Sequence, residues 1–296
     1  MPMPPRGVVP PMTTPFARNG DLALQHMKAQ VDWMVGAGCT GVAAGGSTGE
    51  GHTLDREEYR DLLAAATGAA AGRIPVVAGI IVDSTRDAIR RGKIAKDTKG
   101  VCALQVTPVH YLFRPTDDAM VDHFRAMADE TAMPIIIYNV IPWSYLSPAL
   151  LVRIMNEVPL VVGVKQSAGD LKLFADLMLM ASEKCIYSAV DALLYLSYTL
   201  GAYGSIAALP AAAPHASVKV WEAVQKGDHK TALDLHKKLL VLWNAMSADN
   251  LPAATRYAQE LQGLPTGTFP RAPMPAATEA QRVAIKTALQ GLGALS

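Results

Sequence analysis

Cysteine is scarce in this sequence, and the few cysteines lie far apart. Cys39, Cys102 and Cys185 form no C-x-x-C motif and show no zinc-site spacing. Each lies within or beside an apolar run, as buried free thiols often do. The pattern favours three structural thiols in a reducing compartment over disulfides or a redox pair.

The sequence also lacks an excess of charge of either sign and any long hydrophobic run. Its 296 residues carry 27 lysines and arginines against 26 aspartates and glutamates, so neither a nucleic-acid surface nor a polybasic membrane patch is predicted. No apolar stretch approaches the length of a membrane-spanning helix, and Met1–Val9 has no apolar h-region of a secretory signal. We therefore expect a cytoplasmic protein whose substrates are small molecules.

What the chain does contain is an alternation of short apolar runs with longer amphipathic segments, and half of its residues are hydrophobic. The apolar runs predict strands at residues 7–12, 40–44, 75–82, 101–106, 134–138, 160–164, 185–188 and 204–207. The amphipathic segments predict helices at residues 22–36, 55–71, 84–96, 117–131, 147–156, 171–182 and 193–200.

This alternation predicts an α/β protein with a TIM (β/α)8 barrel over residues 1–225. The strands are apolar almost throughout, as expected for strands covered on both faces. An open doubly wound sheet is the alternative, but Met12-Thr13-Thr14-Pro15 is not the glycine-rich phosphate turn typical of that fold. Further helices are predicted near the end of the chain, so residues 226–296 are expected to form a C-terminal helical extension packed on the barrel.

Active-site groups of such barrels lie at the C-terminal ends of the strands, on the loops that follow. The segment Gly45-Gly46-Ser47-Thr48-Gly49-Glu50 directly follows the second predicted strand. Its glycines allow close approach of the backbone, and its hydroxyl and N–H groups suit a carboxylate. A plain glycine turn is the alternative interpretation.

Two further candidates end predicted strands. Lys165 ends the sixth, where burial would lower its pKa and leave an amine able to attack a ketone and form an imine. Tyr138 ends the fifth and could relay protons. A solvated lysine and a core-closing tyrosine are the alternatives. Both residues and the turn at Gly45–Glu50, called the Ser47 turn below, are expected to converge on one barrel mouth. We therefore favour chemistry on a 2-oxo acid through an enamine.

In order and spacing, these motifs resemble the dihydrodipicolinate synthase/N-acetylneuraminate lyase family over nearly the whole chain. The matching segments are Gly46-Ser47-Thr48-Gly49-Glu50, Val106-Thr107-Pro108, Tyr138-Asn139-Val140 and Gly163-Val164-Lys165. The resemblance implies a TIM barrel with a helical C-terminal extension. It also implies a homotetramer built from dimers, and no metal or organic cofactor.

The resemblance further implies roles for individual residues. Lys165 would be the Schiff-base lysine and Tyr138 the general acid/base. Ser47 and Thr48, with Gly46, would bind the carboxylate of the oxo acid, and Thr48 would link Tyr138 into a hydroxyl relay. Ala189 and Ile206 would contact the bound oxo acid. Apart from the resemblance, the position of Asp191 after the seventh predicted strand indicates that it could touch a polyhydroxylated substrate or merely cap the next helix.

The sequence departs from the synthases at two places. Trp143 stands where they have an arginine that holds the carboxylate of the second substrate, and an indole cannot make that bidentate contact. Trp143 would instead face an apolar part of the acceptor or pack at the rim. The second departure is at Tyr111, which we expect to complete the relay across a dimer interface, with His110 as the alternative.

We therefore expect a class I, Schiff-base aldolase or lyase acting on pyruvate or a related 2-oxo acid together with an aldehyde or sugar acid. Four alternatives remain open. Two are enzymes of the same family: a dihydrodipicolinate synthase proper and a sugar-acid dehydratase. The other two are a non-catalytic barrel that binds an oxo acid and a barrel whose Gly45–Gly49 turn binds a phosphate.

Overall fold

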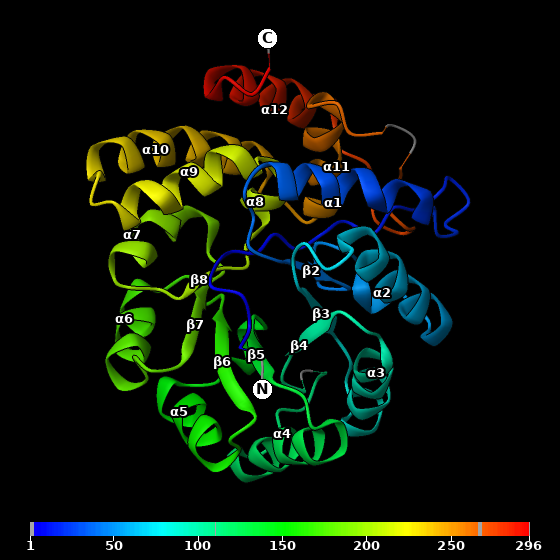
Figure 1. The fold of residues 1–296 in the computed structure, drawn as a ribbon, viewed down its shortest axis with the longest axis vertical. Coiled ribbons are helices and arrows are strands. Elements are labelled where there is room, and N and C mark those ends of the chain that lie inside the picture. Colours follow the sequence, from blue (N-terminus) through cyan, green and yellow to red (C-terminus); the bar gives the residue numbers. More distant parts are fainter. Residues whose placement is uncertain (1–2, 110, 266–267, 296) are drawn as a thin grey trace.

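The computed structural model describes residues 3–109, 111–265 and 268–295. Within them, eight parallel strands form an inner ring that helices surround (Figure 1), which confirms the predicted TIM barrel. The strands are β1 (Gly7–Val8), β2 (Val42–Ala44), β3 (Val76–Ile80), β4 (Val101–Val106), β5 (Ile135–Asn139), β6 (Val161–Gln166), β7 (Cys185–Ser188) and β8 (Gly204–Ser205).

Each of the first seven strands is followed by a helix on the outside of the ring. These helices are α1 (Met27–Gly36), α2 (Arg56–Ala70), α3 (Thr85–Asp97), α4 (Asp117–Thr131), α5 (Pro148–Glu157), α6 (Leu171–Met180) and α7 (Leu194–Thr199). Short 3-10 turns at Leu24–His26, Gly51–Thr53, Pro142–Ser144 and Asp191–Leu193 lie in the connections.

The ring closes between its first and second strands. The hydrogen-bonded order runs from β1 through β8, β7 and the rest to β2. A parallel bridge between Pro11 and Ala43 joins the two ends, supported by backbone hydrogen bonds from Met12 to Ala43 and from Ala43 to Pro10. β1 is shorter than the predicted strand 7–12, because Pro10 and Pro11 lack the N–H group that a ladder needs.

Alternation along the strands divides the buried residues into two cores. Ala103 and Ile136 point into the barrel together with the side chains of Val9, Ala43, Val77, Cys185, Tyr187 and Ile206. Their neighbours Leu104 and Ile137 point outward and pack beneath the helices. Because side chains alternate with a period of two, Tyr138 faces inward with Ile136, and Lys165 faces inward with Gly163.

Helix starts follow the capping signals in the sequence. The Asp55 side chain accepts a hydrogen bond from the Glu58 amide, and Glu58 reaches back to the Asp55 amide, which is the predicted capping box of α2. Ser147 caps α5, with Pro148 at the first helical position as predicted. These local interactions set where the outer helices begin and thus how each strand connects to the next.

The C-terminal part of the chain is helical and lies along one side of the ring, near α1 and α7 (Figure 1). It comprises α8 (Ala208–Ala212), α9 (Pro214–Gln225), α10 (His229–Met246), α11 (Leu251–Leu261) and α12 (Glu279–Leu292). The short apolar helix α8 was not predicted. Helix α9 packs against α10, so contacts cross the predicted boundary at residue 225, and that division stays a prediction.

The three cysteines are free, and burial raises their pKa values, to about 12 for Cys39 and about 11 for Cys102 and Cys185. Thiols with such high pKa values are inert at neutral pH. In the described ranges, no helix combines the length and apolar character needed to cross a membrane.

Candidate active site

A cavity of about 450 Å³ opens at the carboxyl ends of the barrel strands. Six of the predicted site residues line it: Ser47, Thr48, Tyr138, Lys165, Ala189 and Ile206. The structure thus brings together side chains that follow β2, end β5 and β6, or follow β7 and β8. This is the end of a TIM barrel at which active sites are found.

Lys165 lies in this cavity because of the register between two strands. Tyr138 of β5 pairs directly with Lys165 of β6, and both side chains point into the ring. The Lys165 Nζ atom lies 3.6 Å from the centroid of the Tyr138 ring. With only 4% of its surface exposed, Lys165 is a buried amine that still reaches the cavity.

Burial lowers the pKa of Lys165 below its ordinary value, because a buried ammonium loses its hydration. Tyr138 and the carboxylate of Asp191 act in the opposite direction but do not outweigh burial. The neutral form of the amine is therefore more populated than in a solvated lysine, and only the neutral form can attack a carbonyl carbon.

Tyr138 connects the lysine to the turn that follows β2. Its hydroxyl donates a hydrogen bond to Ser47 Oγ over 3.2 Å. The sequence assigned this link to Thr48; in the structure Ser47 makes it, while Thr48 is 8% exposed and lines the cavity beside it. A phenol in this position can pass a proton between the cavity and a serine hydroxyl.

The Ser47 turn has a backbone shape that only glycine allows at key points. Gly45 has a φ of +73°, and a Cβ atom on Gly51 would lie 1.8 Å from the Gly45 carbonyl oxygen. The amides of Gly49 and Gly51 both donate to the Gly46 carbonyl, which folds the turn back on itself. Gly46 therefore stabilises the turn through its carbonyl group, and it is not among the described residues that line the cavity.

A buried ion pair ties this turn to the C-terminal helices. Glu50 is fully buried, with a left-handed φ of 51°, and its Oε1 lies 2.5 Å from Nη2 of Arg256 in α11. The same guanidinium nitrogen donates to the Thr14 carbonyl at 2.6 Å, and the Arg271 amide donates to Glu50 Oε2 at 2.9 Å. The turn is thus held from both sides.

Asp191 is buried at the edge of the cavity, where it opens the 3-10 turn after β7. Its carboxylate accepts a hydrogen bond from the Leu209 amide at 2.5 Å. Burial raises its pKa to about 6 even though this backbone donor favours the charged form. Asp191 was expected to touch the substrate or to cap the next helix, α7; in the structure it instead binds the backbone of α8. It also lines the cavity, so contact with a substrate stays a prediction.

Ala189 and Ile206 belong to the residues that line the cavity. Their amides already donate within the sheet region, Ala189 to Gln166 and Ile206 to Ser188. They are thus placed to touch a bound molecule by packing.

Two predicted site residues lie away from the cavity. Tyr111 and Trp143 are 65% and 66% exposed, and neither belongs to the described residues that line it. The Trp143 indole donates to the Tyr111 carbonyl at 3.1 Å, which joins the loop after β4 to the turn after β5. The prediction for His110 lies outside the described residues.

The sequence interpretation missed the part of the cavity that the C-terminal region forms. Trp243 of α10, Leu251 and Pro252 at the start of α11, and Met274 beyond it all line the same space. Asp249 and His52 add polar groups to the lining. No local motif marks these residues, because they reach the cavity only through the packing of helices distant in sequence.

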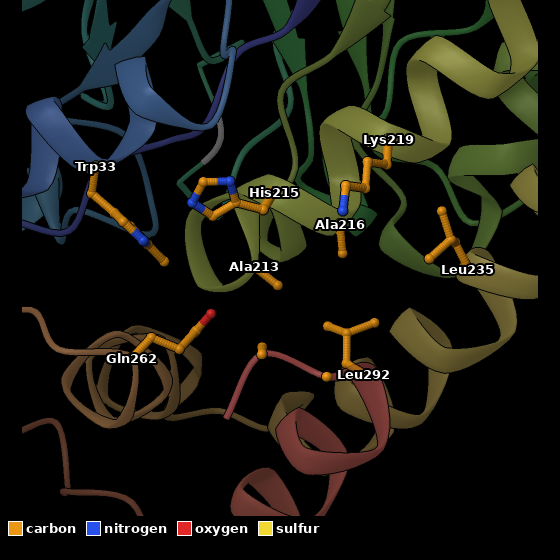
Figure 2. A pocket seen from close by; sticks show the side chains of 10 residues that line it. Trp33, Ala213, His215, Ala216, Lys219, Leu235, Gln262 and Leu292 are labelled. Carbon is orange, nitrogen blue, oxygen red and sulfur yellow. The ribbon is translucent and has the colours of Figure 1, made fainter. Parts of the chain in front are cut away.

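A second cavity, of about 390 Å³, lies among α1, α9 and the end of α12 (Figure 2). Trp33, His215, Lys219 and Gln262 line it, and the Trp33 and His215 rings meet edge to face, with centroids 6.4 Å apart. Its lysine is exposed, in contrast to Lys165. This cavity therefore lacks the desolvated amine that imine chemistry needs.

Among the described residues, no group of three or more His, Cys, Asp or Glu side chains is placed to hold a metal ion. The expected independence from metals and organic cofactors stays a prediction.

Comparison with known proteins identifies the family. The model of the dihydrodipicolinate synthetase family matches residues 4–292. The chain belongs to this family. Members of the family are lyases of the class I aldolase type, and the chain is accordingly a lyase.

Curated relatives within the family match over their full length. A 4-hydroxy-tetrahydrodipicolinate synthase of Bradyrhizobium diazoefficiens is 33% identical over 293 residues, which cover 98% of each chain. One from Phenylobacterium zucineum is 34% identical over 291 residues and 97% of each chain.

Solved structures of family members share the fold. The dihydrodipicolinate synthase of Acinetobacter baumannii complexed with pyruvate gives a TM-score of 0.91 at 30% identity and covers 98% of this chain and 99% of its own. The Escherichia coli prophage protein YagE, also in complex with pyruvate, gives 0.92 at 25% identity over 97% and 98%. Family members with this fold therefore bind pyruvate.

Proposed function

We propose that the protein makes or breaks a carbon–carbon bond next to a 2-oxo acid, with pyruvate or a close relative held as a Schiff base on Lys165. The observation that carries this proposal is the buried Lys165 amine over the Tyr138 ring, at 3.6 Å, inside a cavity lined by Ser47 and Thr48. Pyruvate bound in solved relatives supports the choice of oxo acid.

The proposed cycle begins when the neutral Lys165 amine attacks the ketone carbon. The ketone oxygen leaves as water, and a protonated imine remains. Loss of a proton from the adjacent carbon gives the enamine, whose carbon attacks an aldehyde while the aldehyde oxygen takes up a proton. Water then hydrolyses the imine, which releases a 4-hydroxy-2-oxo acid and restores the amine; cleavage runs in reverse.

Tyr138 is the proposed proton carrier of this cycle, with Ser47 as its hydrogen-bonded partner. Ser47, Thr48 and the free N–H groups of their turn are the proposed site for the substrate carboxylate. The buried Glu50–Arg256 pair supports this assignment, because it fixes the turn in one conformation.

We further propose that the reaction differs from that of the synthases proper. Trp143 stands where the resemblance expects an arginine, and an indole cannot form a bidentate bond with a carboxylate. The names of the curated relatives are compatible with a shared pyruvate step and differ from this proposal only in the second substrate.

A homotetramer built from dimers is the proposed assembly. Tyr111, Leu112 and Phe113 form an apolar loop that is 65%, 72% and 81% exposed, and apolar residues exposed together favour a protein interface. In such a dimer Tyr111 would reach the neighbouring subunit and complete its relay. A related family member is described as a monomeric variant, so sedimentation of the purified protein is the direct test. The free thiols support a cytoplasmic location.

Reductive trapping tests the central proposal. The protein is incubated with pyruvate and sodium borohydride, and peptides are analysed by mass spectrometry. We expect a reduced pyruvate adduct on the peptide containing Lys165. Exchange of the pyruvate methyl protons in D2O reports enamine formation without any knowledge of the acceptor, and it distinguishes a lyase from a barrel that only binds an oxo acid.

In the Lys165→Met variant the adduct should disappear and proton exchange should fall by at least about 10³-fold, because no other group supplies the imine. Lys184→Met is the matched control. Lys184 is a half-buried lysine whose amine donates to the Met155 carbonyl, away from the cavity. An adduct on another lysine, or undiminished exchange in Lys165→Met, would refute the mechanism.

A further inference from the structure

The cavity around Lys165 is larger than a three-carbon oxo acid requires. Its volume of about 450 Å³ lies within the range of roughly 300–1,000 Å³ for sites that enclose ligands of drug size. The groups proposed to handle pyruvate, Lys165, Tyr138, Ser47 and Thr48, all come from barrel strands and the turn after β2. The remaining space therefore belongs to the second substrate.

The C-terminal region lines this remaining space with apolar side chains. Trp243, Leu251, Pro252 and Met274 all contribute, and Val140 adds an apolar side chain after β5. Trp243 is half-buried and packs against the main core while it borders the cavity. An indole fixed in this way offers an aromatic surface against which another ring can pack edge to face or offset-stacked.

The charges around the cavity disfavour an anionic acceptor. Lys165 is the single lysine or arginine among the described lining residues, and imine formation occupies it. The lining instead includes two acids, Asp191 and Asp249. A second carboxylate would meet these acids without a lysine or arginine partner, with His52 as the one histidine of the described lining. A charge without a strong partner in a partly desolvated site is costly.

We propose that the acceptor aldehyde is uncharged and carries an aromatic ring that packs against Trp243. The proposal rests on the enamine chemistry of the proposed function and specifies its second substrate. The enamine carbon bonds to the aldehyde carbon, the aldehyde oxygen takes up a proton, and hydrolysis releases a 4-aryl-4-hydroxy-2-oxo acid. In the cleavage direction the same acid would be split into pyruvate and the aromatic aldehyde.

The test compares two aldehydes of similar size with the full-length protein and pyruvate. Benzaldehyde is aromatic and neutral, whereas succinic semialdehyde is aliphatic and carries a carboxylate. Pyruvate consumption and the hydroxy-oxo acid product are followed by NMR. We expect kcat/KM to favour benzaldehyde by about tenfold or more, the size of effect that one apolar pocket contact produces.

Substitutions of Trp243 test whether the C-terminal residues that line the cavity cause the preference for benzaldehyde. Trp243→Ala should lower the ratio of the benzaldehyde rate to the pyruvate-trapping rate about tenfold, mainly through KM, and Trp243→Phe should restore most of it. Trp33→Ala is the matched control, because Trp33 is a half-buried indole that lines the other cavity (Figure 2). It should leave the ratio unchanged.

A positive charge introduced into the cavity lining at Leu251 should have the opposite effect on the choice of aldehyde. Leu251→Arg should shift the preference toward succinic semialdehyde by about tenfold, because it supplies the missing partner for a carboxylate. Leu251→Met keeps the side chain neutral and should not shift it.

The outcomes separate this inference from the proposed function. Normal trapping of pyruvate on Lys165 without a preference for benzaldehyde, including no turnover of it, would overturn the aromatic acceptor alone. A ratio that falls equally in Trp243→Ala and Trp33→Ala would also overturn it. Failure to trap pyruvate on Lys165 would overturn the proposed function and the acceptor class together.

Discussion

The two sides of the Lys165 cavity are built by different means. On the strand side, Tyr138 and Lys165 are neighbours because β5 and β6 pair in a fixed register. On the other side, Trp243 and Leu251 reach the cavity through packing among α10, α11 and the barrel, over large distances in sequence. The strand side carries polar and titratable groups, and the helical side is largely apolar.

This difference suggests a division of labour within one cavity. A sheet register fixes two side chains with little freedom, which suits groups that must meet a reacting atom. Helix packing tolerates changes of side chain more readily, which suits a wall that selects the second substrate. We therefore expect substitutions on the strand side to affect the reaction itself and those on the helical side to affect which aldehyde is accepted.

The largest effect expected in this comparison comes from the strand side. Tyr138→Phe removes the proton carrier but keeps the ring beneath the lysine, so proton exchange should fall about 10²- to 10⁴-fold while pyruvate can still be trapped. NMR in D2O measures the exchange. Tyr145→Phe is the control, because Tyr145 is not among the described residues that line the cavity and its hydroxyl donates to the Ser167 carbonyl. An equal loss of proton exchange in both variants would contradict the proposed role of Tyr138 as the proton carrier.

The next largest effect is expected at the buried Glu50–Arg256 ion pair, which links the turn after β2 to α11. Arg256→Met leaves the Glu50 carboxylate buried without its partner, and we expect a loss of about 3–5 kcal/mol in the free energy of unfolding, measured by urea denaturation. Arg256→Met combined with Glu50→Gln should recover much of that loss, because no unpaired charge remains.

Lys172→Met is the matched control for Arg256→Met, because it also removes one partner of an ion pair. The Lys172–Asp176 pair lies on the surface of α6 with 74% and 37% of the side chains exposed, and such pairs contribute about 0.5 kcal/mol or less. If Arg256→Met cost no more than this, the turn after β2 would not depend on the helical side.

The smallest effect concerns Asp191 and depends on pH. Its pKa is raised to about 6 from an ordinary 3.8, so the folded protein binds more protons than the unfolded chain between about pH 4 and pH 6. Stability therefore falls as the pH rises through that window. The loss attributable to this carboxyl is about 3 kcal/mol at 1.36 kcal/mol per pKa unit, and it is complete above the folded pKa.

Asp191→Asn should remove this part of the pH dependence. Relative to the wild type, the variant should gain stability progressively from pH 4 to pH 7, as thermal or urea unfolding at a series of pH values would show. A constant difference between the two proteins across this range would mean that Asp191 does not titrate there.

Much of the strand side could be predicted from sequence, for physical reasons. An apolar run that ends in Lys165 indicates a buried strand with an amine at its mouth, and two-residue alternation decides whether the side chain points inward. The Asp55 and Ser147 caps likewise mark where helices begin. The partner of Tyr138 was assigned to the wrong hydroxyl, because adjacent residues of one turn differ in direction in a way that only the folded backbone determines.

The helical side could not be predicted in the same way. Trp243 lies in an amphipathic helix whose pattern shows that one face is buried but not what it faces. Met274 lies within a proline-rich connector, Pro270 to Pro275, that has no periodic signal. Trp143 was expected to face the acceptor or to pack at the rim, and sequence could not decide between them; in the structure its indole contacts the Tyr111 backbone on an exposed loop.

The seam between β1 and β2 has a consequence for the whole barrel. A sheet with two open ends offers unpaired backbone groups to other chains, and this ring removes both ends with a few hydrogen bonds around Pro10–Met12 and Ala43. Gly45, the first residue of the Ser47 turn, comes two positions after Ala43. Loss of the backbone hydrogen bonds between Pro10–Met12 and Ala43 would therefore expose two strand edges prone to aggregation. It would also free the Ser47 turn at its N-terminal end. Resistance to aggregation and retention of activity thus depend on the same backbone contacts.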